Sequence, residues 1–276
     1  MKKIRLIALD IDGTLLNDDK NVPPENLRAL REARDAGVQV AISSGRMIPT
    51  IEPVEEMLEV DTVIIAYNGG KVVGPRAQGR PVIDHRPVPV DVAEEFIGFS
   101  TGQGYLLNFY HEDRLYADET TAARRFMDVY SGRTGSRYHL VDLNQFRGVE
   151  PTKMILLAAP EERDRLYERF SREYGERASI SRSDPEYLEI MAPGVTKGSA
   201  LPVLAAHYGF TTEEILAVGD ADNDNEMLEI AGLGVAVANA RPSTKEIADV
   251  VTERTNNEGA IAEAVYRFAL GGSPGG

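Results

Sequence analysis

The stretch that most constrains the fold of this chain is Ile4–Thr14, an apolar run that ends in two carboxylates. The apolar part is too short for a stable helix, but it suits a strand buried on both faces, which is typical of parallel sheets covered by helices. Asp10 and Asp12 follow it, with Gly13 directly behind. Side chains two residues apart on extended backbone point to the same face, so both carboxylates can enter one pocket at the carboxyl edge of the sheet. Taken alone, the stretch is equally compatible with a strand that ends in an ordinary Asp-Gly turn.

A second acidic cluster, far along the chain, also follows an apolar run directly. The run is Ile215–Gly219, and the cluster begins at Asp220 and ends at Asp224. If the two strands are neighbours, the carboxylates that converge are those of Asp10, Asp12, Asp220 and Asp224. Two like charges about 4 Å apart repel by about 4 kcal/mol at an effective dielectric of about 20. Several such pairs rival a typical domain stability of about 5–15 kcal/mol, so the cluster calls for a cation.

Carboxylate oxygens favour Mg²⁺ or Ca²⁺ over Zn²⁺ as the bound ion. Asp220, Asp222 and Asp224 match the first three ligand positions of an EF-hand loop, but its glycine and glutamate fall on Asn225 and Ala231. Mg²⁺ is therefore the predicted cofactor. It usually takes one or two protein carboxylates together with a substrate phosphate, which leaves a carboxylate free to attack phosphorus.

The order of the expected elements predicts an α/β fold with a doubly wound parallel sheet. The first part has expected strands at 4–9, 38–43 and 62–67 and expected helices at 24–36 and 51–58. Asn68-Gly69-Gly70 then predicts a hairpin turn into a strand at 71–74. The regular alternation of strand and helix stops near Asp84 and resumes near Pro193. Residues 84–190 are therefore predicted to form an inserted α+β domain. The tail Gly271–Gly276 is expected to be disordered.

The remaining expected elements divide between the insertion and the returning sheet. In the insertion, helices are expected at 91–101, 122–131 and 161–174, and strands at 104–110, 114–117, 153–159, 178–183 and 187–191. After it, helices are expected from 198 to 208 and at 226–231, 243–248 and 259–269, and strands at 215–219, 233–238 and 250–252. The core is thus split in sequence by the inserted domain.

Composition excludes several classes of protein. The net charge of −14 over 276 residues argues against nucleic acids and against anionic membrane surfaces as partners. The absence of cysteine excludes disulfides, thiolate nucleophiles and zinc–cysteine sites, and it fits a cytoplasmic location. No stretch approaches the roughly 18 apolar residues that a membrane span needs. A small phosphorylated molecule is the expected partner, and the oligomeric state stays open.

Two further residues are candidates for holding a phosphoryl group, whose oxygens need donors and cations. Ser44, at the end of the second strand, can supply a hydroxyl and a backbone N–H. Lys197, in the loop before a helix, can supply a positive charge. Each alone is more typical of a turn serine or a solvated lysine. Their order between the two acidic clusters favours the functional interpretation.

The motifs together resemble the haloacid dehalogenase superfamily of phosphotransferases, and most closely its Cof-type, type IIB sugar-phosphate phosphatases. The matching pieces are Asp10-Ile-Asp12-Gly13-Thr14, Ser43-Ser44-Gly45-Arg46, Asn68-Gly69-Gly70, Thr196-Lys197-Gly198 and Gly219-Asp220-Ala221-Asp222-Asn223-Asp224. The late Asn257-Glu258-Gly259 also resembles a segment common there. The resemblance implies a Rossmann-like core at 1–83 and 191–276, with 84–190 as an inserted α/β cap domain.

The resemblance also implies residue roles. Asp10 would be the nucleophile and Asp12 the general acid/base. Ser44 and Lys197 would hold the phosphoryl group. The implied Mg²⁺ ligands are Asp10, the backbone carbonyl of Asp12 and Asp220, supported by Asp224. The further candidates are Gly45 and Asn223 for phosphate, Arg46 and Asn68 for the pocket lining, and Glu189 and His111 of the insertion for substrate.

We therefore expect a Mg²⁺-dependent phosphatase that hydrolyses a small phosphorylated metabolite, a sugar phosphate by preference, through an aspartyl-phosphate. A phosphomutase of the same superfamily would use the same residues and stays an alternative. A phospho-aspartate signalling receiver is disfavoured, because it has no carboxylate at the position of Asp12 and no insertion. A catalytically inactive binding protein is disfavoured because no motif residue is missing. The sequence does not name the substrate or the pathway.

Overall fold

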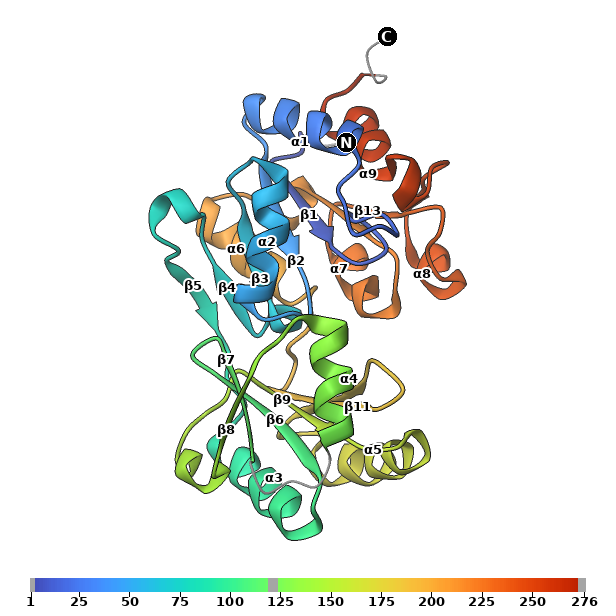
Figure 1. Cartoon of the computed structure of the whole chain (residues 1–276). Coiled ribbons are helices and arrows are strands. Elements are labelled where there is room, and N and C mark those ends of the chain that lie inside the picture. Colours follow the sequence, from blue (N-terminus) through green and yellow to red (C-terminus); the bar gives the residue numbers. More distant parts are fainter. Residues whose placement is uncertain (1–2, 119–123, 273–276) are drawn as a thin grey trace. The chain divides into compact units, whose positions relative to one another are not determined.

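The structure is a computed structural model that describes residues 3–118 and 124–272 of the chain. It forms two compact units, each with its own sheet (Figure 1). The first, called here the core unit, comprises Met1–Asp84 and Thr196–Gly276, and the second, the inserted unit, comprises His85–Val195. The sequence placed the second boundary at 190, but the chain stays with the inserted unit beyond that point. There the backbone N–H of Gly194 donates to the Ser179 hydroxyl at 3.1 Å.

The sheet of the core unit has the order β14-β13-β12-β1-β2-β3-β4-β5 in the described part of the chain. Its strands are β1 (Leu6–Asp10), β2 (Gln39–Ser43), β3 (Val63–Ala66), β4 (Lys71–Val73), β5 (Val82–His85), β12 (Ile215–Gly219), β13 (Leu233–Ala236) and β14 (Val250–Val251). All neighbours from β14 to β3 pair in parallel, whereas β3 and β4 form the antiparallel hairpin that Asn68-Gly69-Gly70 predicted. β1 is central, and all five of its residues are buried.

Helices cover this sheet, most of them through buried apolar residues. They are α1 (Pro24–Asp35), α2 (Ile48–Leu58), α6 (Ala200–Tyr208), α7 (Asn225–Ile230), α8 (Pro242–Ile247) and α9 (Ala260–Ala264). Proline near the first turn starts α1, and its buried Ala29, Leu30 and Ala33 lie at helical spacing. Leu201 and Leu204 of α6 pack with Leu6 and Ala8 of β1 in one apolar cluster. The resulting layers of helix and sheet bury β1 at the centre, with Asp10 at its carboxyl end.

The inserted unit is an α+β domain built on a second sheet, of order β10-β11-β9-β6-β7-β8. Its elements are α3 (Val90–Gln103), β6 (Leu106–His111), β7 (Arg114–Asp118), α4 (Arg124–Thr134), β8 (Tyr138–Val141), β9 (Lys153–Leu157), α5 (Pro160–Tyr174), β10 (Ser179–Arg182) and β11 (Tyr187–Met191). Phe96 of α3 and Phe170 of α5 meet edge to face at 4.9 Å between ring centroids, inside one apolar cluster with the sheet.

The observed elements follow the expected ones with a few differences. The predictions contained neither β5 nor β8, both at sheet edges and only partly buried. The helix expected at 259–269 begins as α9 and continues as a π-helical turn, Val265–Ala269. Part of the helix expected at 122–131 and most of the tail expected to be disordered, 273–276, lie outside the described residues.

Over residues 3–118 and 124–272, none of the helices combines the length and the apolar character that crossing a membrane requires.

Candidate active site

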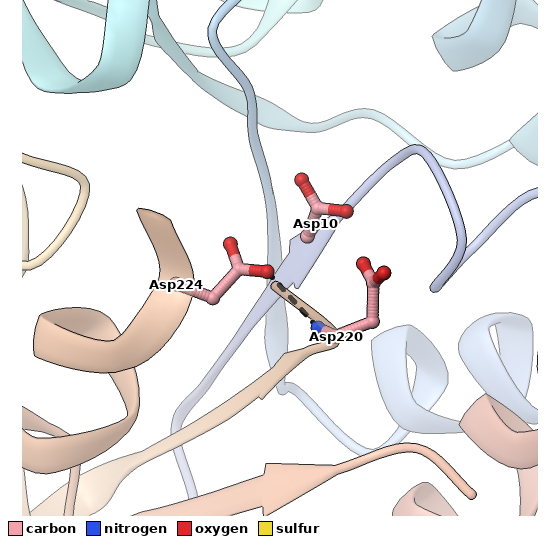
Figure 2. Close-up of side chains that lie close together, drawn as sticks. All are labelled: Asp10, Asp220 and Asp224. Carbon is pink, nitrogen blue, oxygen red and sulfur yellow. Dashed lines mark hydrogen bonds between the residues drawn. The ribbon is translucent and has the colours of Figure 1, made fainter. Parts of the chain in front are cut away.

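Three aspartates meet at the carboxyl edge of the core sheet. Leu9 of β1 pairs in parallel with Val218 of β12, so Asp10 lies level with Gly219, and Asp220 follows one residue beyond at the same edge of the sheet. Asp224 lies in a short 3-10 turn, η5 (Asp222–Asp224), that leads into α7. One carboxylate oxygen of each aspartate lies within 4.8 Å of the others (Figure 2). The convergence that the sequence predicted for these three residues is therefore present.

Lys197 lies inside this cluster. Its Nζ donates to Oδ1 of Asp10 and to Oδ1 of Asp224, both at 2.6 Å, and its side chain is 1% exposed. Burial by itself lowers the pKa of a lysine, but the carboxylates of Asp10 and Asp224 outweigh it and raise the pKa of Lys197. Lys197 therefore carries a positive charge at neutral pH and is no solvated surface lysine.

The same burial acts on the carboxylates in the opposite sense. Desolvation, followed by the nearby charge of Asp224, raises the pKa of Asp10 well above its ordinary value. Desolvation also raises the pKa of Asp220. Three carboxylates and one ammonium group leave a formal charge of −2, which one divalent cation balances. The donor set and its charge thus fit Mg²⁺.

Asp224 is held differently from its two neighbours. Its Oδ2 accepts from the backbone N–H groups of Asp220 and Ala221 at 3.0 and 3.1 Å, while its Oδ1 accepts from Lys197. Both of its oxygens already have donors. Asp224 is therefore suited to positioning Lys197 and the Asp220 backbone.

Gly13 allows the loop after β1 to approach Asp220. It adopts φ +84°, and a Cβ at this position would lie 2.6 Å from Oδ2 of Asp220. The next residue, Thr14, donates from its hydroxyl to Oδ1 of Asp220 at 2.9 Å. Glycine followed by a hydroxyl residue therefore fits the loop tightly against the acidic cluster.

Asp12 lies apart from the buried cluster, with 44% of its side chain exposed. Arg46 donates to both of its carboxylate oxygens, from Nε at 2.9 Å and from Nη2 at 2.6 Å. Nζ of Lys20 donates to Oδ1 of Asp12 at 3.2 Å. The structure thus brings Asp12 and Arg46 together. The convergence predicted for four carboxylates holds for three, because the Asp12 carboxylate pairs with Arg46 and Lys20 instead.

The residues predicted to bind phosphate lie on three segments of the core unit: after β2 (Ser44 and Gly45), before α6 (Lys197) and in η5 (Asn223). Ser44 is buried just beyond β2, where Ser43 pairs with Asp10, and its Oγ accepts from the backbone N–H of Arg46 at 3.3 Å. A Cβ on Gly45 would lie 3.0 Å from Oδ1 of Asn68, so these two loops touch. Asn223 lies exposed in η5.

The two candidates from the inserted unit differ in exposure. Glu189 of β11 is 5% exposed, and it forms an ion pair with Nζ of Lys153 at 2.9 Å and accepts from the Ser183 hydroxyl at 2.8 Å. His111, at the end of β6, has 31% of its side chain exposed. Of the two, His111 is the one that solvent reaches.

Sequence reasoning did not single out Thr14 or Lys20 as site residues. Thr14 had a signal, because it follows the Asp-x-Asp-Gly pattern directly. Lys20 had none, since its approach to Asp12 depends on a turn closed by Asn17, whose carbonyl accepts from the backbone N–H of Lys20 at 2.9 Å.

This fold and site define a haloacid dehalogenase-like hydrolase, and the chain belongs to that family: the family model matches residues 7–265. Its relatives carry phosphatase names. The chain is 30% identical to the 5-amino-6-(5-phospho-D-ribitylamino)uracil phosphatase YcsE of Bacillus subtilis, over 97% of this chain and 96% of that protein. It is 30% identical to the HMP-PP phosphatase of Serratia proteamaculans, over 88% of this chain and 87% of that protein.

Solved structures agree with this assignment. The crystal structure of TM0651 from Thermotoga maritima superposes with a TM-score of 0.85 at 31% identity, covering 96% of this chain and 97% of that one. A haloacid dehalogenase-like hydrolase from Bacteroides thetaiotaomicron superposes with a TM-score of 0.86 at 26% identity, covering 96% and 99%. The protein is thus a phosphatase of the haloacid dehalogenase family, of the Cof type.

Proposed function

We propose that this protein is a Mg²⁺-dependent phosphatase that hydrolyses a small phosphorylated metabolite through an aspartyl-phosphate on Asp10. The observation that carries the proposal is the placement of Asp10, 6% exposed, between the ammonium group of Lys197 and the carboxylate of Asp220. A buried carboxylate beside a fixed cation is suited to attack a phosphoryl group, whose charge the same cation then stabilises.

In the first step a carboxylate oxygen of Asp10 bonds to phosphorus while the bond to the leaving oxygen breaks. Asp12 donates a proton to that departing oxygen. In the second step Asp12 takes a proton from a water molecule, which attacks phosphorus and releases phosphate and free Asp10. Lys197 and Ser44 hold the phosphoryl oxygens during both steps. Gly45 and Asn223 are proposed as further phosphate contacts.

Mg²⁺ would be held by Asp10, the backbone carbonyl of Asp12 and Asp220. The support for this is the uncompensated charge of the cluster and the raised pKa of Asp10, which a cation would return toward its ordinary value. When bound, the ion neutralises charge on the phosphoryl oxygens and orients them for attack. Asp224 supports the site by holding Lys197 and the backbone after β12.

The leaving group is proposed to be a sugar or another polyhydroxylated alcohol. The support comes from YcsE, whose substrate, 5-amino-6-(5-phospho-D-ribitylamino)uracil, carries a phosphorylated ribityl chain. The core unit supplies groups for the phosphoryl transfer, with Arg46 and Asn68 as candidate pocket residues. We propose that the inserted unit supplies most of the selectivity, with His111 as its exposed candidate and Glu189 acting through its pair with Lys153.

The decisive test is Asp10→Asn, which keeps the shape of the side chain and removes its nucleophilic charge. We expect it to abolish phosphate release from every member of a panel of sugar phosphates, nucleotides and aryl phosphates in Mg²⁺. The matched control is Asp19→Asn, the same change at an exposed position of the following loop, which should keep full activity.

Activity of Asp10→Asn above a trace would contradict the covalent mechanism. Product analysis of the active protein separates a phosphatase from a phosphomutase. A mutase would return the phosphoryl group to the sugar and release little free phosphate.

A further inference from the structure

The loop that carries Asp12 is held by asparagine side chains from the far end of the chain. Nδ2 of Asn239 donates to the backbone carbonyl of Gly13 at 2.7 Å. Nδ2 of Asn256 donates to the backbone carbonyl of Leu16 at 2.9 Å. Asp12 and Leu16 themselves form an isolated β-bridge. The two amides therefore fix the loop at Gly13, directly after Asp12, and at Leu16, which pairs with Asp12.

The two asparagines also hold each other. Oδ1 of Asn239 accepts from the backbone N–H of Asn256 at 2.8 Å, so its amide bridges the two segments with both ends. Asn256 is buried, with 4% of its surface exposed. Its neighbour Asn257 accepts from the backbone N–H of Asp18 at 2.9 Å and donates to its carboxylate at 3.1 Å. The loop is thus fixed at three successive points.

The late motif Asn257-Glu258-Gly259 explains why Asn256 is held in place. Glu258 accepts from the backbone N–H and the hydroxyl of Thr255 at 3.0 and 2.8 Å and closes a tight turn. Gly259 continues the chain at φ +84°, and a Cβ there would lie 2.4 Å from Cγ of Glu25. Thr255, Glu258 and Gly259 therefore build the turn that presents Asn256 and Asn257 to the loop.

Asp12 needs this support because its own side chain has little packing. It is 44% exposed, and it pairs with two flexible side chains, those of Arg46 and Lys20. In the proposed mechanism it must reach the leaving oxygen and later a water molecule. A misplacement of about 1 Å at such a group can cost about a hundredfold in rate.

We propose that Asn239 and Asn256 are positioning residues for Asp12: they fix the backbone at Gly13 and Leu16 and thereby hold the general acid where the leaving oxygen departs. This inference rests on the role proposed for Asp12. It assigns a function in the reaction to a segment more than 200 residues away in the chain.

The test uses Asn239→Asp and Asn256→Asp, which keep the size of the side chain and replace the donating NH₂ by an oxygen. A general acid matters most when the leaving group is a strong base. We therefore expect kcat/KM for an alkyl phosphate to fall about ten- to a hundredfold, and that for 4-nitrophenyl phosphate to fall less than about threefold. A role confined to stability would lower both values by the same factor.

The matched control is Asn26→Asp. Asn26 is fully buried in the same unit, its Oδ1 accepts from the backbone N–H of Ala262, and its Nδ2 has no partner in the described part of the chain. This variant should lower the melting temperature without changing the ratio of the two kcat/KM values. If Asn256→Asp does not fold, the exposed Asn239→Asp still decides the question.

Asp12→Ala, measured in parallel, separates the inference from the proposed function. Suppose that Asp12→Ala lowers kcat/KM much more for the alkyl phosphate than for 4-nitrophenyl phosphate, while both asparagine variants lower the two values by the same factor. The positioning role is then wrong, and the role of Asp12 stands. If Asp12→Ala lowers both equally, Asp12 is not the general acid and the inference fails with it. The supporting result is a ratio that shifts in both asparagine variants and in Asp12→Ala, but not in Asn26→Asp.

Discussion

Lys197 is the residue on which the charge balance of the site depends. We predict that Lys197→Met, which keeps an apolar stem and removes the ammonium group, lowers the free energy of unfolding by about 3–5 kcal/mol, because it leaves Asp10 and Asp224 buried without their cation. Urea unfolding in the presence of a chelator measures this. Lys245→Met, on α8, is the control and should change stability little. An unchanged midpoint for Lys197→Met would contradict the importance of the buried pair.

Lys153 and Glu189 form a second buried pair, with 4% and 7% of their side chains exposed. Removing one partner should destabilise the protein by about 3–5 kcal/mol, because the other charge stays buried. The double variant Lys153→Met with Glu189→Leu should recover most of that loss. A double-mutant cycle by urea unfolding tests this, and simple additivity of the two single variants would refute the coupling.

At the scale of elements, an ion-pair cluster ties α3 to the segment after α5. Arg177 donates to Asp91 at 2.7 Å and to Glu95 at 2.8 Å. The hydrogen bond from Arg177 lowers the pKa of Asp91, and the hydrogen bonds from Arg177 and then Tyr174 lower the pKa of Glu95. Groups whose pKa is lowered on folding stabilise the protein above their unfolded values, and they lose that contribution as the pH falls through the folded values.

We therefore expect Arg177→Met to lower the thermal midpoint at neutral pH and to lose this effect progressively as the pH falls below about 4. Arg165→Met on α5, an exposed arginine 3.5 Å from Glu162, is the control and should show a smaller pH-dependent difference. A difference between wild type and Arg177→Met that stays constant from neutral to acid pH would show that packing of Arg177 on Tyr174, and not charge, carries its contribution.

Buried elements were predictable from the sequence because their patterns are local. β12 spans Ile215–Gly219 as expected, since a run buried on both faces has no polar interruption. The edge strands β5 and β8 were missed because they are short and polar residues such as Asp84 and His139 interrupt their apolar residues. In the site, Asp10, Asp220 and Asp224 could be predicted because they follow strand ends. The contacts of Lys20 and Asn256 could not, because they depend on the paths of loops.

At the scale of the whole molecule, metal binding should act on one of the two units. We predict that Mg²⁺ raises the melting temperature and a chelator lowers it, because the ion binds the assembled cluster and not the unfolded chain. At a free concentration of about 100 times Kd the gain is about 2.7 kcal/mol. Calorimetry should assign the shift to the core unit, and Asp220→Asn should reduce it. Equal midpoints in millimolar Mg²⁺ and in chelator would contradict a metal site.

The pairing of β1 with β12 has a consequence for how the protein folds during its synthesis. Between them lie about 200 residues that the ribosome must still synthesise when β1 has emerged. At about 5–20 residues per second this takes about 10–40 seconds. During most of that time the edge of β1 that pairs with β12 is open, and Asp10 has no ion pair with Lys197. An apolar strand with an open edge binds chaperones and other nascent chains readily. We therefore expect the nascent chain to depend on chaperones until its last third has been synthesised.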